Sequence, residues 1–102
     1  MDIYAALDLM RLACNHQHDY NDHTRKSLLR GIHELADSCI ASIQERDDPE
    51  QYGDAQSELE LIKDFSETGL QSGDLATAFV HIRETVWRVI PAPEGMGSRL
   101  NI

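Results

Sequence analysis

Basic residues are scarce in this 102-residue sequence, and their scarcity limits the kinds of partner that it suits. Nine lysines and arginines stand against 18 aspartates and glutamates, which gives a formal net charge of -9. Proteins bind nucleic acids and anionic membranes by neutralising phosphates with a patch of lysines and arginines. The charge therefore argues against direct binding to nucleic acid or to a membrane, and it favours a protein partner with a basic surface.

Cysteines are few, and a leader and long apolar runs are missing. In a tight hairpin of the first two predicted helices, Cys14 lies beside the start of the second helix and Cys39 lies beyond the start of the first. We therefore predict two thiols without a disulfide. The first 14 residues lack the positive start and the cleavage site of a signal peptide. No apolar run approaches the roughly 18 residues of a membrane-spanning helix. We expect a reducing, cytoplasmic setting.

The common sequence patterns of enzymes are missing too. There is no G-x-x-x-x-G-K-[ST] loop for phosphate, no strand that leads into G-x-G-x-x-G, and no G-x-S-x-G turn around a nucleophilic serine. HELAD, residues 33 to 37, is similar to the zinc-peptidase pattern H-E-x-x-H, but Asp37 stands where the second histidine belongs. We therefore expect no enzymatic activity and no cofactor.

Apolar residues recur at helical spacing near the start of the chain and predict a helix over residues 2–16. A second apolar set, Ala5, Leu9 and Leu12, lies nearly opposite the main stripe of this helix. A helix that is apolar around most of its circumference is buried on more than one side. We expect it at the centre of a bundle or in an oligomer interface.

The helical spacing of apolar residues is lost over residues 17–27. It returns after them and predicts a second helix, which Asn21, Asp22 or Thr24 can cap. Gly31 lies inside it, where glycine costs about 1 kcal/mol relative to alanine, and we expect it to allow a close helix crossing. The predicted buried stripe is Leu28, Ile32, Leu35, Cys39 and Ile43.

The second half of the sequence predicts two further helices. The third starts at a Ser57–Glu60 capping box, or earlier at Asp54, and ends near Thr68. Gly69 is expected to take the left-handed position of a Schellman motif there, with Leu70 packed on Phe65. The fourth helix is predicted next along the chain. It follows a cap at Ser72 or Asp74, and it stops at Ile90, before Pro91.

These segments together predict an all-α fold, an antiparallel bundle of about four helices joined by short connections. Residues 1–90 form a single helical domain in this prediction. Residues 91–102, PAPEGMGSRLNI, are expected to be a flexible, disordered tail, because they hold too few apolar side chains to bury much surface.

A dense run of metal-capable side chains, NHQHDYNDH, occupies residues 15 to 23. His18 and Asp22 have the i, i+4 spacing of helical metal ligands, and His and Asp side chains bind Zn²⁺ or a similar ion. The same residue types also suit a hydrated turn and a helix N-cap. A metal- or small-ligand-binding site therefore stays open as the alternative function, with the candidate ligands His16, His18, Asp22 and His23.

A stripe on the predicted fourth helix points away from its core stripe and is a candidate for partner binding. It consists of Ala76, Val80, Arg83 and Trp87. Trp87 and Arg83 are one turn apart, which allows a cation–π contact, and both residue types are frequent at binding hot spots. The alternative is that this side packs under the first helix or the tail.

The segment from residue 45 to 60 holds seven of the 18 carboxylates. A concentration of negative charge can steer a basic protein surface toward the chain, and it can also serve only solubility. The carboxylates assigned to partner binding are Asp47, Asp48, Glu50 and Asp54. The sequence thus predicts a small acidic helical protein-interaction module: a regulator, adaptor or inhibitor, in a narrower version a nucleic-acid mimic. It is expected to act as a homodimer, with apolar burial around Trp87 and Val80 and also Leu9 and Leu12.

Overall fold

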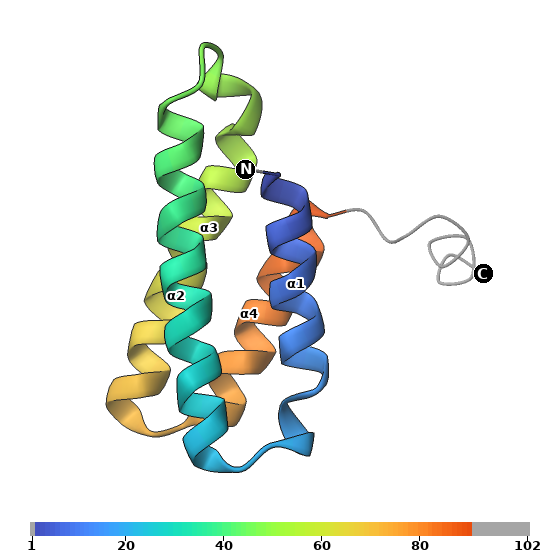
Figure 1. The fold of residues 1–102 in the computed structure, drawn as a ribbon, viewed down its shortest axis with the longest axis vertical. Helices are drawn as coiled ribbons and strands as arrows, with labels where there is room; N and C mark the ends of the chain where they lie inside the picture. Colours follow the sequence, from blue (N-terminus) through green and yellow to red (C-terminus); the bar gives the residue numbers. More distant parts are fainter. Residues whose placement is uncertain (1, 91–102) are drawn as a thin grey trace, which may run out of the picture.

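The computed structural model describes residues 2–90, which form four antiparallel helices (Figure 1). These are α1 (Ile3–Asn15), α2 (Asp22–Gln44), α3 (Gly53–Ser72) and α4 (Leu75–Val89), with 3-10 turns at Gln17–Asp19 and Pro49–Tyr52. Within the described part of the chain there is no strand, and no helix is long and apolar enough to cross a membrane. The predicted all-α bundle is confirmed; the tail predicted over residues 91–102 lies outside the described residues.

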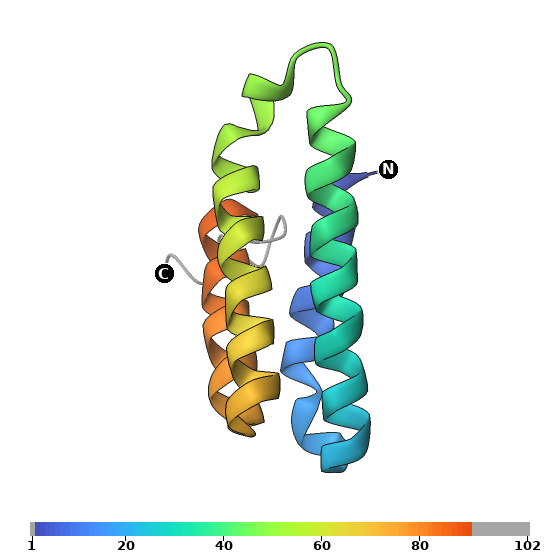
Figure 2. The same cartoon turned by 90° about the vertical axis from the view of Figure 1, so that its left-hand side faces the viewer.

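The four helices form two layers, with α1 and α2 in one and α3 and α4 in the other (Figure 2). Neighbours along the chain pack closely from α2 to α3 and from α3 to α4, and α4 packs on α1. The contact between α1 and α2 is looser than these three. The bundle is therefore least tightly closed on the side where its first two helices lie next to each other.

Apolar side chains from all four helices fill the core between the layers. Burying one leucine, isoleucine or phenylalanine side chain contributes about 1.5–3 kcal/mol. The polar Ser66 and Thr85 are also fully buried, and their hydroxyls donate to the carbonyl oxygens one turn earlier at 2.7 and 2.8 Å. These hydrogen bonds offset the cost of burial. The largest fully buried apolar side chains are those of Ile3, Leu7, Met10, Leu29, Ile43, Leu59, Ile62, Phe79, Ile82 and Val86.

Three helices begin at side-chain caps: Asn21 and Asp74 were among the predicted candidates, whereas Asp2, predicted as the first residue of its helix, is the cap before it. The carboxylate of Asp2, the amide oxygen of Asn21 and the carboxylate of Asp74 each accept from the backbone N–H three residues later, at 3.1, 2.9 and 3.2 Å. Such a cap is worth about 1 kcal/mol. At the other end of α4, Ile90 has φ -91° and ψ 119°, so the helix stops before Pro91 as expected.

The third helix begins one residue before the earlier of its two predicted starts, Asp54, but its predicted end is wrong. It begins at Gly53, and Ser57 lies one turn inside it, where its hydroxyl donates to the Gly53 carbonyl oxygen at 3.2 Å. It continues past Gly69 to Ser72, and Gly73, with φ 80°, takes the left-handed position. Gly69 is instead a packing residue, because a Cβ there would lie 2.5 Å from the Cβ of Ala78 on α4.

The close helix crossing expected at Gly31 is absent. Gly31 is exposed, and no atom lies within 4 Å of the place where its Cβ would be. The buried side of α2 also includes Leu29, Ala36 and Ile40, so it is rotated from the predicted stripe. Leu28 and Leu35, expected in the core, are only half-buried.

Candidate functional site

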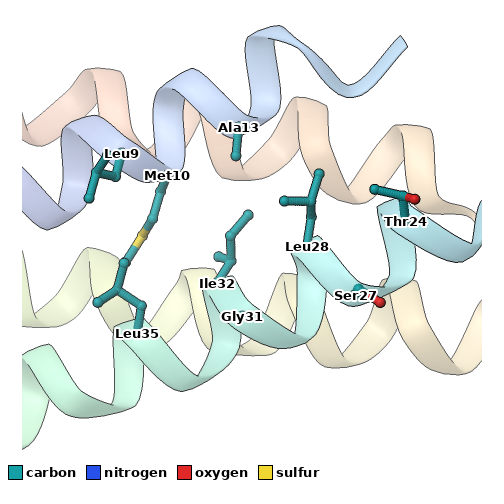
Figure 3. A pocket seen from close by; sticks show the side chains of 9 residues that line it. All are labelled: Leu9, Met10, Ala13, Thr24, Ser27, Leu28, Gly31, Ile32 and Leu35. Carbon is teal, nitrogen blue, oxygen red and sulfur yellow. The ribbon is translucent and has the colours of Figure 1, made fainter. Parts of the chain in front are cut away.

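An apolar groove lies between α1 and α2, where these helices are in loose contact (Figure 3). Its volume is about 300 Å³. The described residues that line it carry no ionisable side chain. Figure 3 shows the side chains of Met10, Leu28, Ile32 and Leu35 directed into the space between the two helices. The nine lining residues are Leu9, Met10, Ala13, Thr24, Ser27, Leu28, Gly31, Ile32 and Leu35.

Small residues explain why this space is not filled by the protein's own side chains. Ala13 contributes only a methyl group from α1, and Gly31 contributes no side chain from α2. Thr24 and Ser27 extend the lining toward the start of α2 with short hydroxyl side chains. The result is a hollow with apolar walls that is open to solvent on one side.

Exposed leucines on α1 adjoin the groove. Leu9 is 61 % exposed and Leu12 is 42 % exposed, and Ala5 on the same side of the helix is exposed as well. The two-sided apolarity of α1 predicted from the sequence therefore leaves one side exposed among residues 2–90. Leu9 belongs both to this side and to the groove. We call the nine groove residues together with Ala5 and Leu12 the α1–α2 face.

The stripe predicted on the fourth helix is only partly available to a partner. Ala76, Val80 and Arg83 are exposed, but Trp87 is half-buried. The guanidinium over the Trp87 ring comes from Arg11 of α1, whose Cζ lies 5.3 Å from the ring centroid. Arg11 is 8 % exposed and also donates to the carboxylate of Asp8. Trp87 thus contributes to the contact between α1 and α4, as the alternative interpretation of this stripe proposed.

The four candidate metal ligands lie at the turn between α1 and α2, and all of them are exposed. His16 is the C-cap of α1, and its Nδ1 lies 3.3 Å from an oxygen of Asp19. Asp22 accepts from Arg25 at 2.9 Å. Over residues 2–90, no group of three or more His, Cys, Asp or Glu side chains is arranged to hold a metal ion. The candidate ligands His16, His18, Asp22 and His23 are not brought together as one such group.

The acidic segment forms the connection from α2 to α3 and the first turns of α3. Asp47, Glu50 and Asp54 are exposed, whereas Asp48 is half-buried. A stack of side chains orders the connection: the Arg46 guanidinium lies 4.7 Å from the centroid of the Tyr52 ring, which lies 6.1 Å from the Tyr4 ring. Three of the four assigned carboxylates are therefore accessible to a partner.

Two residues of the HELAD segment, His33 and Asp37, contact side chains of α3. His33 Nε2 lies 2.8 Å from Glu67, and Lys63 donates to Asp37 at 2.8 Å. The hydrogen bond from Lys63 and its positive charge lower the pKa of the Asp37 carboxyl. These pairs link α2 to α3 on the side away from α1.

The two thiols are buried and do not form a disulfide, as predicted. Burial raises the pKa of Cys14 to about 12, and it also raises the pKa of Cys39. Only the thiolate is a strong nucleophile or metal ligand, so both side chains remain protonated and inert at neutral pH.

Comparison with models of protein families, with curated proteins and with solved structures finds no match to this chain. The function proposed below rests on the residues and their geometry. The sequence pattern predicts an interface role for Leu9 and Leu12, but it does not predict the groove beside them. The sequence features that could have indicated this groove are the two small residues, Ala13 and Gly31, on neighbouring helices.

Proposed function

We propose that this protein is a small acidic protein-interaction module that forms a homodimer and binds a partner protein as a regulator, adaptor or inhibitor. The observation that supports this most is the exposure of Leu9, at 61 %, beside an uncharged apolar groove. Contiguous exposed apolar surface of this kind marks interaction sites. Within residues 2–90 of a single copy, Leu9 and Leu12 of the α1–α2 face stay in contact with water.

A second copy of the chain suits the α1–α2 face for two reasons. Two chains with a net charge of -9 repel each other, and this repulsion is weakest where the contact surface carries no ionisable group. The face also offers protruding leucines and a groove on the same patch. A two-fold symmetric dimer brings one patch against its copy, so that Leu9 and Leu12 of each chain meet the groove of the other.

The acidic segment supports the second part of the proposal, a partner with a basic surface. The exposed carboxylates of Asp47, Glu50 and Asp54 add to a surface that is negative overall. Such a surface speeds the encounter with a positively charged protein and suppresses contact with acidic ones. A nucleic-acid mimic that occupies a nucleic-acid-binding protein is the narrower version of this proposal.

Sedimentation equilibrium at micromolar concentration tests the dimer. The wild-type protein is expected to sediment as a dimer, and a Leu9→Ser/Leu12→Ser variant as a monomer. Each leucine contributes about 1.5–3 kcal/mol when it is buried, so losing both weakens association at least tenfold. Leu61→Ser, which replaces a 38 % exposed leucine on α3, is the matched control and should remain dimeric. A wild-type protein that is monomeric throughout this range would refute the dimer.

A further inference from the structure

A second groove lies in the other layer of the bundle, between α3 and α4, with a volume of about 410 Å³. Its apolar lining includes Leu61, Phe65 and Ala78. Leu61 is 38 % exposed and Phe65 is half-buried, so this lining is accessible to solvent. No side chain proposed for the dimer lines this groove.

The packing of α3 on α4 creates this second groove. Gly69 and Ala78 meet so closely that a Cβ at Gly69 would lie 2.5 Å from that of Ala78. Small residues at the crossing leave no bulky side chain above it. Beside the crossing, the rings of Phe65 and His81 lie with their centroids 4.9 Å apart and their planes tilted by 53°, and they form one wall.

The two grooves differ in charge. The ionisable groups among the described residues of the α3–α4 groove are Asp64, Asp74 and His81, with no lysine or arginine. Both aspartates are exposed. Hydrogen bonds from Thr77 lower the pKa of Asp74, so this carboxylate stays ionised well below neutral pH. The α1–α2 groove, by contrast, has no ionisable group in its lining.

We propose that the α3–α4 groove binds a basic amphipathic segment of the partner protein. Apolar side chains of that segment contact Leu61 and Phe65, and its lysines or arginines lie beside Asp64 and Asp74. This inference rests on the proposed function, because it takes the partner to be a protein. It names a site that is separate from the dimer contact, and it gives the chemistry of the segment that fills it.

Charge complementarity selects this occupant over the others. A second copy, with its net charge of -9, would be repelled by the two aspartates. A small cation alone would leave the apolar lining in water. A segment that presents apolar side chains on one side and basic side chains at its edges satisfies both features at once, as helices bound in grooves do.

The test is a selection of random peptides displayed on phage against the purified full-length protein, followed by affinity measurements on synthetic copies of the enriched peptides. The enriched peptides are expected to be positively charged, with apolar residues at i, i+3 or i+4 spacing. Asp64→Asn/Asp74→Asn should weaken their binding about tenfold, since it removes two charge contacts. Asparagine at position 74 still caps α4, so this variant should fold.

Matched variants locate the binding site. Asp19→Asn/Glu34→Gln removes the same number of negative charges at exposed positions outside the groove, and it should change the affinity less than about twofold. Leu61→Ser should weaken peptide binding, and Leu9→Ser should leave it unchanged. Peptide binding that persists in a monomeric Leu9→Ser/Leu12→Ser protein would separate this site from the dimer contact.

Three results would overturn the proposal. The first is a selection that yields no peptides, or only peptides without basic residues. The second is equal weakening of peptide binding by Asp64→Asn/Asp74→Asn and by the control Asp19→Asn/Glu34→Gln, which would show that only the net charge matters. The third is unchanged peptide binding by Leu61→Ser, which would place the site elsewhere.

Discussion

Gly31 and Gly69 both lie inside helices, but only Gly31 has room for a methyl group. Nothing lies within 4 Å of a Cβ at Gly31, whereas a Cβ at Gly69 would lie 2.5 Å from the Cβ of Ala78 and 3.3 Å from Cδ1 of Leu29. The same substitution is therefore expected to have opposite effects at the two positions.

We predict that Gly69→Ala lowers the free energy of unfolding by about 1–3 kcal/mol, the usual cost of overpacking. Gly31→Ala should raise it by up to about 1 kcal/mol, because alanine has the higher helix propensity and meets no neighbour. Urea unfolding followed by circular dichroism measures both. Equal stability of the Gly69→Ala and wild-type proteins would contradict the close contact of α3 with α4.

Cys14 makes the stability depend on pH in the alkaline range. Its side chain is 3 % exposed, and burial raises its pKa from 9.0 to about 12, although the charge of Arg83 acts in the opposite direction. Between these two pKa values the unfolded chain loses a proton that the folded chain keeps. The folded state is therefore destabilised as the pH rises through this window, by up to about 1.4 kcal/mol per pH unit.

Urea unfolding at several pH values above 9.0 should show this decline for the wild-type protein. A Cys14→Ala variant is less stable at neutral pH because it leaves a small cavity, but its stability should fall less steeply over the same window. The comparison is between slopes, so the neutral-pH difference does not affect it. Parallel slopes for the two proteins would show that Cys14 does not titrate differently in the folded state.

At the scale of the helices, local interactions were predictable and contacts between helices were not. Asn21 and Asp74 cap helices through atoms only three residues away, so the sequence predicted them as candidate caps. The end of α3 offered two glycines, Gly69 and Gly73. Which of them ends the helix depends on the approach of Ala78 from α4, and sequence spacing does not contain that information.

In the candidate site too, features of a single helix were predictable and contacts between helices were not. The spacing of Leu9 and Leu12 predicted a second apolar side on α1, but not whether another helix of this chain covers it. The groove depends on how closely α1 approaches α2. Gly31 was expected to allow a close helix crossing, but it lies beside the groove, and no other helix lies within 4 Å of the place where its Cβ would be. Trp87 was expected to be available to a partner, but Arg11, from a distant part of the sequence, lies over its ring.

At the scale of the whole molecule, the two layers of the bundle carry grooves of different character. The α1–α2 groove has no ionisable lining residue, and the α3–α4 groove has two aspartates beside its apolar lining. In the proposed dimer the first groove is filled by the second copy, which leaves an α3–α4 groove on each chain. One dimer then offers two equivalent sites for basic segments, and a partner with two such segments gains affinity from their simultaneous binding.

The α1–α2 face is proposed as a protein-recognition surface, and the most direct test is an NMR cross-saturation experiment on dimers formed from isotope-labelled and unlabelled copies of the chain. Saturation of the unlabelled copy is expected to reach the amides of Leu9, Ala13 and Gly31 in the labelled copy, and not those of Asp64 and Asp74. No transfer between copies, or transfer confined to α3 and α4, would contradict this surface.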